Sequence, residues 1–181
     1  FFFTMLAHTA RRAVLSTSLN PLARFYSAQT VLDAPALIRT DGTAVESKEI
    51  FAGKKVVIFG VPGAFTPVCS NQHVPSFVNN AALLRSKGVD NIICVSVNDR
   101  FVMKKWQASI EGGENVEFLS DWNGEFVKKL GLDIDLSIAF LGTRSKRFSL
   151  LVDNGAIVQK NVEQKPSDMT VSGAEEILKS L

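Results

Sequence analysis

The chain has 181 residues, of which 46% are hydrophobic, and this is enough for one domain with a substantial core. Its net charge of +2 gives no reason to expect a nucleic-acid surface, and no apolar run approaches the roughly 20 residues that a membrane span needs. Two cysteines cannot form the disulfide framework of a small secreted protein, and they suit a reducing compartment.

Residues 1–26 differ in composition from the rest of the chain. They contain Arg11, Arg12 and Arg24 but no acidic residue. Of the 20 basic residues, 17 lie after residue 26, together with all 18 acidic residues, so residues 27–181 have a net charge of −1. A basic, acid-free segment that can form an amphipathic helix is typical of a mitochondrial transit peptide. We therefore expect residues 1–26 to be a transit peptide and residues 27–181 to be the folded domain.

Three other interpretations of the targeting signals stay open. A secretory signal peptide needs an unbroken apolar core of roughly 7–15 residues, which Arg11 and Arg12 interrupt. Residues 1–26 could also be an ordinary disordered tail. The chain ends in Lys-Ser-Leu, a permutation of the peroxisomal Ser-Lys-Leu signal. The expected location is the mitochondrial matrix, with the peroxisome and the cytosol as alternatives.

The first element expected in the folded domain is a buried strand over residues 54–60, because its apolar residues are nearly continuous. A Pro62-Gly63 turn follows. Residues 70–87 then carry apolar side chains at helical spacing, and Gly88 is a plausible C-terminal stop. Pro75 lies inside this predicted helix and is expected to kink it.

The remaining elements alternate between strands and helices. Asn154-Gly155 between two apolar runs predicts a hairpin, and Ser172 with Glu175 predicts a capping box that opens a last helix. The other predicted segments are strand 92–97, a helix capped by Asn98 or Asp99 and running to about Ile110, strand 116–119, helix 123–130 stopped at Gly131, and hairpin strands 148–153 and 156–161. This order predicts an α/β domain with a central mixed sheet flanked by helices on both faces.

Cys69 lies where the first strand gives way to the first helix. In the first helical turn, unpaired N–H groups and the positive end of the helix dipole favour a negative sulfur, which is the nucleophilic form of cysteine. Thr66 places a hydroxyl three residues earlier, where it could also merely cap the helix. The alternative for Cys69 is an inert buried thiol.

The segment Pro-Gly-Ala-Phe-Thr-Pro-Val-Cys over residues 62–69 resembles the peroxiredoxin motif P-x-x-x-T-x-x-C, and its first six residues resemble the type II, or type 5, subgroup. The resemblance covers nearly everything after about residue 30. It implies a thioredoxin-like fold and a thiol peroxidase that reduces hydrogen peroxide and organic hydroperoxides. Cys69 would be the nucleophile, Thr66 would bond the sulfur or the peroxide, and Pro62 would shield the thiolate. No cofactor and no metal are implied.

Three further residues are candidates for the site. The resemblance implies that Arg147, in Lys-Arg-Phe-Ser, reaches across to the thiolate and polarises the peroxide; Arg144 is its rival. His73 follows Cys69 by four residues and would share its helix face, where it could tune the thiolate, line the entrance or be a partly exposed structural residue. Cys94, in a predicted buried strand, is either an inert core thiol or a resolving cysteine.

Recycling of the enzyme is expected to need an outside reductant. Some relatives carry a resolving cysteine in the C-terminal segment, but residues 166–172 contain none. The sulfenic acid formed by peroxide attack would then be reduced by glutaredoxin with glutathione, or by thioredoxin. The resemblance also implies a homodimer that serves antioxidant defence and redox homeostasis, and neither a nucleic acid nor a membrane is expected as a partner.

Other cysteine chemistries fit the sequence less well. A thiol-disulfide oxidoreductase calls for Cys-x-x-Cys, which is absent, and a cysteine phosphatase needs an arginine six positions after the cysteine, where Pro75 stands. A zinc module built from Cys69, His73 and Cys94 lacks the usual paired cysteine spacing. A redox sensor that uses the same sulfenic acid to oxidise partners stays open.

Overall fold

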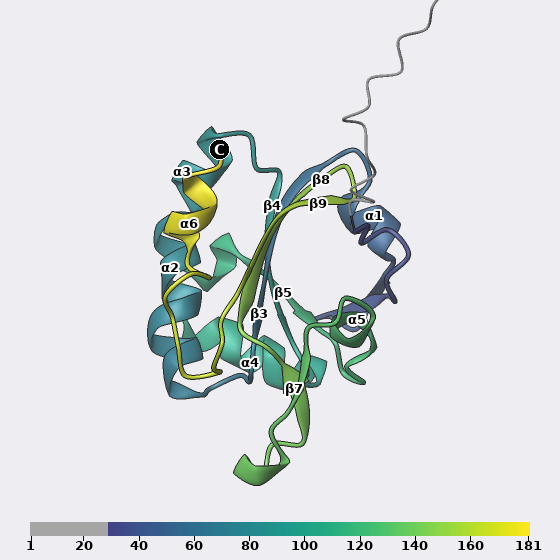
Figure 1. Cartoon of the computed structure of the whole chain (residues 1–181), viewed down its shortest axis with the longest axis vertical. Coiled ribbons are helices and arrows are strands. Elements are labelled where there is room, and N and C mark those ends of the chain that lie inside the picture. Colours follow the sequence, from purple (N-terminus) through teal and green to yellow (C-terminus); the bar gives the residue numbers. More distant parts are fainter. Residues whose placement is uncertain (1–28) are drawn as a thin grey trace, which may run out of the picture.

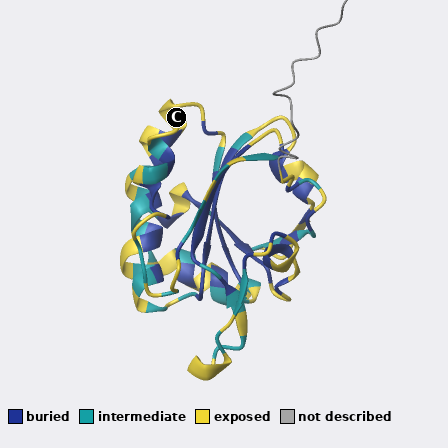
Figure 2. Ribbon diagram, viewed as in Figure 1, coloured by how far each residue is buried: buried dark blue, intermediate teal, exposed yellow. Residues whose placement is uncertain are grey.

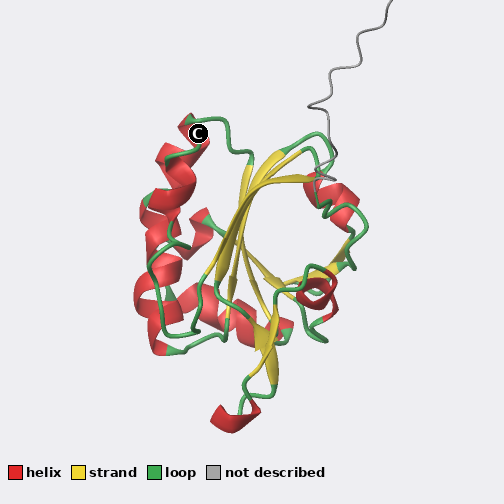
Figure 3. Ribbon diagram, in the orientation of Figure 1, coloured by secondary structure: helices red, strands yellow, loops and turns green. Residues whose placement is uncertain are grey.

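The computed structural model describes residues 29–181, so the predicted transit peptide lies outside the described residues. A seven-stranded sheet forms the centre of this part of the chain, and helices cover both of its faces (Figures 1 and 3). The predicted α/β fold with a central mixed sheet is confirmed. From residue 29 onward, none of the helices combines the length and the apolar character that crossing a membrane requires.

Three central strands of the sheet are parallel and the outer pairs are antiparallel. The parallel strands β3, β4 and β5 therefore all end at the same edge. A separate two-stranded ribbon projects beyond that edge (Figure 1). In spatial order the main sheet consists of β2 (Ala44–Val45), β1 (Leu37–Arg39), β5 (Glu117–Ser120), β4 (Asn91–Ser96), β3 (Lys55–Val61), β8 (Phe148–Asp153) and β9 (Ala156–Val162), and the ribbon of β6 (Asp133–Asp135) and β7 (Thr143–Ser145).

The helices divide into two layers (Figure 1). One face of the sheet is covered by α1 (Ser47–Phe51) and α5 (Glu125–Lys129). The other face carries a π-helical turn, η1 (Cys69–His73), and the helices α2 (Val74–Asn79), α3 (Ala81–Ser86), α4 (Arg100–Ser109) and α6 (Ala174–Leu178). Two short 3-10 turns complete the described elements, η2 (Gly113–Asn115) and η3 (Ser137–Ala139).

Strand β3 separates two hydrophobic cores because its side chains alternate between the faces. Val56 and Ile58 pack with the layer of α1 and α5. Val57 and Phe59 pack into the opposite core, which also contains Cys69. All of these side chains are fully buried, and the central strands are dark blue over most of their length in Figure 2. The cysteine is thus part of the core that the π turn, α2 and α6 cover.

The structure confirms the longer predicted elements. The strands expected over 54–60, 92–97 and 116–119 appear within one residue of those bounds as β3, β4 and β5, a difference normal for element ends. The hairpin forms at Asn154 and Gly155, which both have positive φ as a tight hairpin turn requires. The cap of α4 is Asp99 and not Asn98, because the Asp99 side chain accepts bonds from the N–H groups of Phe101 and Val102.

The helix predicted over residues 70–87 is divided into η1, α2 and α3. In η1 the N–H of Val74 donates to the carbonyl of Cys69, five residues back. Pro75 has no N–H to continue an α-helical ladder, and the wider π turn precedes it. A second interruption, which the sequence analysis did not predict, falls at Asn80, between α2 and α3.

The predicted capping box at the last helix is wrong. Gly173 precedes α6 and has no side chain that could cap it, and the N–H of Ala174 donates to the hydroxyl of Ser76 (2.8 Å). The hydroxyl of Ser172 donates to Glu163, and the carboxylate of Glu175 accepts from Ser76 and Asn80. Both side chains therefore bond to partners brought by the tertiary fold. The short elements β1, β2, α1, β6 and β7 were not predicted, since two to five residues are too few to show a hydrophobic period.

Candidate active site

The pairing of β3 with β8 brings Arg147 to the cysteine loop. The strands are antiparallel, with Gly60 opposite Phe148, so the start of β8 lies beside the end of β3. A Cβ at Gly60 would lie 2.0 Å from the Phe148 ring, and only glycine allows this ring to pack there. Arg147 directly precedes Phe148, and the loop to Cys69 directly follows β3.

The loop after β3 is fixed from the neighbouring strand β4. The side-chain oxygen of Asn98 accepts bonds from the Ala64 N–H (3.0 Å) and the Ser96 hydroxyl (2.8 Å). Phe65 has φ of 62°, a conformation that is strained for an aromatic residue and tends to occur at functional sites. The hydroxyl of Thr66 donates to the Gly63 carbonyl (2.9 Å), which leaves its oxygen free to accept a further bond.

Cys69 lies in the first turn of the helical segment, which begins at Pro67, and its side chain is fully buried. The next residue, Ser70, accepts a bond from the Trp106 indole of α4 (3.0 Å), so α4 holds this turn in place. The guanidinium Nη2 of Arg147 lies 3.5 Å from the Cys69 sulfur, within the range of a hydrogen bond to sulfur.

Arg147 is a buried cation whose orientation is set by backbone carbonyls. Only 2% of the residue is exposed. Its Nε and Nη2 atoms donate to the Pro166 carbonyl at 3.1 and 2.8 Å. Among the described residues no carboxylate forms an ion pair with it. A buried charge is costly without a partner, and the Cys69 sulfur lies within hydrogen-bond range of this guanidinium.

His73 supports Arg147 from the other side. It is fully buried, so it neither lines an entrance nor is partly exposed, and both of those expectations are wrong. Its Nε2 lies 3.0 Å from the Ser172 carbonyl and its Nδ1 lies 3.2 Å from Nη1 of Arg147. The carbonyl can only accept and the guanidinium can only donate, so Nε2 carries the hydrogen and Nδ1 accepts.

Burial, followed by the neighbouring Arg147 charge, lowers the pKa of His73 from 6.5 to about 3, against weaker opposing effects of the Ser172 carbonyl and Glu163. The imidazole is therefore neutral at physiological pH. A neutral ring can accept from the guanidinium, whereas an imidazolium would repel it. His73 therefore contacts Arg147 as a neutral hydrogen-bond acceptor.

Neutral His73 makes the stability of the fold depend on pH. Between pH 6.5 and about 3 the unfolded chain binds a proton at this residue and the folded chain does not, so stability falls as the pH decreases through that window. Proton binding at this residue in the unfolded chain should lower the free energy of unfolding by about 2 kcal/mol between pH 7 and pH 5. Urea unfolding of wild type and His73→Asn at both pH values measures it. The variant has no titrating side chain at this position, so its free energy of unfolding should fall by about 2 kcal/mol less than that of wild type between the two pH values. Equal losses in the two proteins would contradict a neutral His73.

Arg144, the rival arginine, bonds elsewhere. Its Nε donates to the Leu141 carbonyl (2.8 Å) and its Nη1 to the Val97 carbonyl (3.0 Å). The guanidinium therefore ties the ribbon of β6 and β7 to the end of β4. The geometry favours Arg147 over Arg144 as the cation at the sulfur.

Cys94 lies in the middle of β4, opposite Phe59 of β3, and is fully buried. Burial, and then the proximity of Cys69, raise the pKa of its thiol well above the ordinary value. Both cysteines are free thiols. Within residues 29–181 no three His, Cys, Asp or Glu side chains are grouped closely enough to hold a metal ion, so the alternative of a zinc module finds no site there.

A pocket of about 340 Å³ is lined by Pro62, Thr66 and Arg147, and Cys69 itself is not among its lining residues. Ser167 and apolar side chains of the ribbon and its neighbours line the rest. Pro62 is buried. The three residues predicted around Cys69 are thus brought together, and a small molecule in this pocket would contact a hydroxyl and a guanidinium at once. The apolar lining consists of Pro67, Val68, Leu136, Ala139, Leu141 and Pro166.

Three parts of the site were missed by the sequence analysis. Asn98 was considered only as a helix cap, although it holds the cysteine loop. The carbonyl of Pro166 carries no sequence signal, because every residue has one. Glu163 is a buried carboxylate among neighbours that gave no motif. These groups become visible only when distant segments are placed together.

Comparison with known proteins identifies the family of this chain. The family described as Redoxin matches residues 27–178. Peroxiredoxin-2C of Oryza sativa subsp. japonica is 58% identical over 130 residues, which are 72% of this chain and 80% of the relative. The mitochondrial Peroxiredoxin-2F of Arabidopsis thaliana is 44% identical over 181 residues, covering 95% of this chain and 90% of the relative.

The chain belongs to the type II peroxiredoxins. A crystal structure of reduced Prx3 from Vibrio vulnificus in complex with hydrogen peroxide superposes with a TM-score of 0.79 at 44% identity, over 84% of this chain and 96% of the other. The sheet and helix layers of this peroxiredoxin are thus the thioredoxin-like fold. It is an enzyme, a thiol peroxidase of the oxidoreductase class.

Proposed function

We propose that this peroxiredoxin reduces hydrogen peroxide and organic hydroperoxides at Cys69. The observation that carries the proposal is the 3.5 Å contact between Arg147 Nη2 and the Cys69 sulfur, and Arg147 also lines a pocket together with Thr66 and Pro62. The Vibrio vulnificus relative, whose structure holds hydrogen peroxide, supports the same class of substrate.

In the proposed reaction the Cys69 thiolate attacks one oxygen of the peroxide. A sulfur–oxygen bond forms, the O–O bond breaks, and the leaving oxygen takes a proton to depart as water or alcohol. Cys69 is oxidised to a sulfenic acid. Arg147 stabilises the charge that develops on the oxygens, and Thr66 accepts a bond from the peroxide O–H, which is the electrostatic logic of an oxyanion site. Pro62 shields the thiolate from water.

Organic hydroperoxides are included because of the pocket wall. Val68, Leu136, Ala139 and Leu141 face the space above Thr66, and an alkyl group placed there would be removed from water. Hydrogen peroxide gains nothing from such a wall. Rates with hydrogen peroxide, tert-butyl hydroperoxide and cumene hydroperoxide should therefore lie within the same range; failure of both alkyl peroxides to react would restrict the proposal to hydrogen peroxide.

The proposed reductant is glutaredoxin with glutathione, or thioredoxin. The segment 166–172 brings no cysteine, and Cys94 is buried in a strand, so a second thiol must come from outside. Steady-state peroxide consumption with the two reducing systems in parallel tests this proposal. Turnover with at least one system is expected. No turnover with either, while a single equivalent of peroxide still oxidises Cys69, would favour the redox-sensor alternative.

Cys94 should prove dispensable for the attack on peroxide. Its thiol is buried and stays protonated because burial raises its pKa. Cys94→Ser is expected to leave the rate of Cys69 oxidation unchanged. Mass spectrometry of the peroxide-treated wild type should find mainly Cys69 sulfenic acid, or its mixed disulfide after glutathione is added. A dominant peptide cross-link between Cys69 and Cys94 would identify Cys94 as the resolving cysteine.

We also propose a homodimer that forms at the edge where β3, β4 and β5 end. Large apolar side chains are exposed in the segments that follow these strands and in the ribbon, which is more than scattered surface residues explain. Sedimentation velocity of the purified protein tests this, with a monomer at micromolar concentration as the contrary result. The exposed side chains are Phe65, Phe101, Trp122, Ile138 and Phe140.

The proposed location is the mitochondrial matrix, with residues 1–26 as the transit peptide. The relative from Arabidopsis thaliana that aligns with 95% of this chain is named as mitochondrial. Residues 1–26 fused to a fluorescent reporter are expected to direct it to mitochondria. Replacing Arg11 and Arg12 with Glu should block import, because acidic residues oppose entry of a basic helix driven by the membrane potential. An unchanged distribution of that double variant would contradict the proposal.

A further inference from the structure

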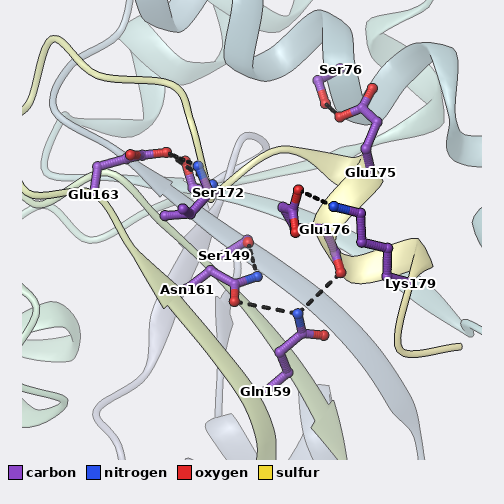
Figure 4. A network of polar contacts seen from close by, with 10 residues as sticks. Ser76, Ser149, Gln159, Asn161, Glu163, Ser172, Glu175, Glu176 and Lys179 are labelled. Carbon is purple, nitrogen blue, oxygen red and sulfur yellow. Dashed lines mark hydrogen bonds and ion pairs between the residues drawn. The ribbon is translucent and has the colours of Figure 1, made fainter.

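Glu163 directly follows β9 and is only 6% exposed. Its side chain accepts five hydrogen bonds from three consecutive residues of one segment. Oε1 accepts from the N–H groups of Thr170 (2.7 Å), Val171 (2.8 Å) and Ser172 (2.9 Å) and from the Ser172 hydroxyl (2.8 Å). Oε2 accepts from the Thr170 hydroxyl (2.8 Å). Figure 4 shows the carboxylate directed at Ser172.

The segment that Glu163 holds, residues 164–172, is the one that orients the site. The carbonyl of Pro166 accepts both bonds that fix the Arg147 guanidinium, and the carbonyl of Ser172 accepts the bond from His73. The backbone N–H of Glu163 also donates to the Arg147 carbonyl at 2.9 Å. Glu163 thus connects the start of β8, which carries Arg147, to the segment that directs its side chain.

The carboxylate is suited to this task because it stays charged. Burial opposes ionisation, but the donors on Val171, Ser172 and Thr170 outweigh it and lower the pKa of Glu163 from 4.5 to about 2. No Lys or Arg side chain in the part of the chain that the structure describes forms an ion pair with it. Bonds from neutral donors to an anion are about twice as strong as bonds between neutral groups, so the segment is tied firmly.

We propose that Glu163 is a positioning residue of the peroxidase, which holds segment 164–172 so that the Arg147 guanidinium is directed at the Cys69 sulfur. The Glu163 side chain has no hydrogen bond to the sulfur and is not among the residues that line the pocket of Thr66 and Arg147. The inference rests on the proposed roles of Cys69 and Arg147, and it adds a residue that acts only through them.

The test compares Glu163→Ala and Glu163→Gln with Glu175→Gln. Glu175 is the matched control because its carboxylate also ties the C-terminal part of the chain, through Ser76 and Asn80 of the helical layer, and holds neither carbonyl of the site (Figure 4). The rate of reaction with hydrogen peroxide and the alkylation rate of Cys69 by iodoacetamide are measured as functions of pH, with thermal unfolding alongside.

Glu163→Ala is expected to slow the reaction with peroxide about tenfold and to move the alkylation profile of Cys69 to higher pH, since the guanidinium is no longer held at the sulfur. Glu163→Gln keeps an oxygen acceptor without the charge and should slow the reaction only several-fold. Glu175→Gln should change neither. A folded Glu163→Gln with wild-type rate and alkylation profile would overturn the inference even if Glu163→Ala fails to fold.

A double variant separates positioning from a general loss of structure. If Glu163 acts through Arg147, combining Glu163→Gln with Arg147→Ala should slow the reaction no further than Arg147→Ala alone. If the effects of the two substitutions on the rate multiply in the double variant, Glu163 acts by another route, which contradicts the inference. If Arg147→Ala itself leaves the rate unchanged, the proposed role of Arg147 falls and the inference falls with it. If only the Glu163 variants are without effect, the proposed function stands and the inference alone is overturned.

Discussion

Cys69→Ser is expected to abolish peroxide reduction while the protein keeps its fold. Serine has nearly the size of cysteine, and the site is a tightly packed core position, so the packing changes little. The hydroxyl is not ionised at neutral pH and is a far poorer nucleophile than a thiolate. Peroxide consumption with a saturating reductant measures the effect, and circular dichroism verifies the fold.

The matched control for this experiment is Cys94→Ser, because that thiol is equally buried in the same core but has no hydrogen bond to an arginine among the described contacts. It should retain the first step of the reaction in full. More than a few per cent of wild-type activity in Cys69→Ser, with Cys94 intact, would show that Cys69 is not the nucleophile.

Arg147→Ala is expected to slow the reaction with peroxide by roughly tenfold or more, since each 1.4 kcal/mol of lost transition-state stabilisation is about a factor of ten. The variant removes the cation 3.5 Å from the sulfur, so less thiolate should be present at pH 7. Stopped-flow oxidation and the pH profile of Cys69 alkylation measure the two effects separately. Arg147→Lys should recover only part of the rate, because a lysine lacks the planar guanidinium that bonds the Pro166 carbonyl and the His73 ring at the same time.

Arg144→Ala is the control for the arginine. It removes a guanidinium of the same type from the same stretch of chain, but one that bonds the carbonyls of Leu141 and Val97. A smaller effect on both measurements is expected. If Arg144→Ala reproduces the loss and Arg147→Ala does not, the assignment of the cation is reversed.

The parts of this fold that could be predicted are those whose signals are local. The apolar runs of β3 and β4 and the Asn154-Gly155 turn each have a physical cause within a few residues, and each appears in the structure. The Pro62-to-Cys69 segment is likewise contiguous, and its resemblance to a family motif led to Arg147 as well.

The parts that were predicted wrongly or missed depend on distant partners. Ser172 and Glu175 have the spacing of a capping box, but each finds a better partner in another segment. Two of the three expectations for His73 placed it at least partly at the surface, because its sequence neighbours do not show that Ser172 and Arg147 enclose it. Glu163 gave no signal at all, since a carboxylate after a strand is ordinarily solvated and only the fold brings five donors to it.

Within residues 29–181 no carboxylate forms an ion pair with the buried Arg147 guanidinium, and this bears on the oxidised enzyme. In a mixed disulfide with glutathione, Cys69 no longer carries a negative charge, and the guanidinium loses its counter-ion. Under the proposed mechanism, reduction restores the pair, so we expect the folded protein to favour the reduced form and the reduction potential of such a disulfide to be raised. The cation proposed to promote attack on the peroxide would then also make the Cys69 sulfur a good leaving group when a reductant attacks the disulfide.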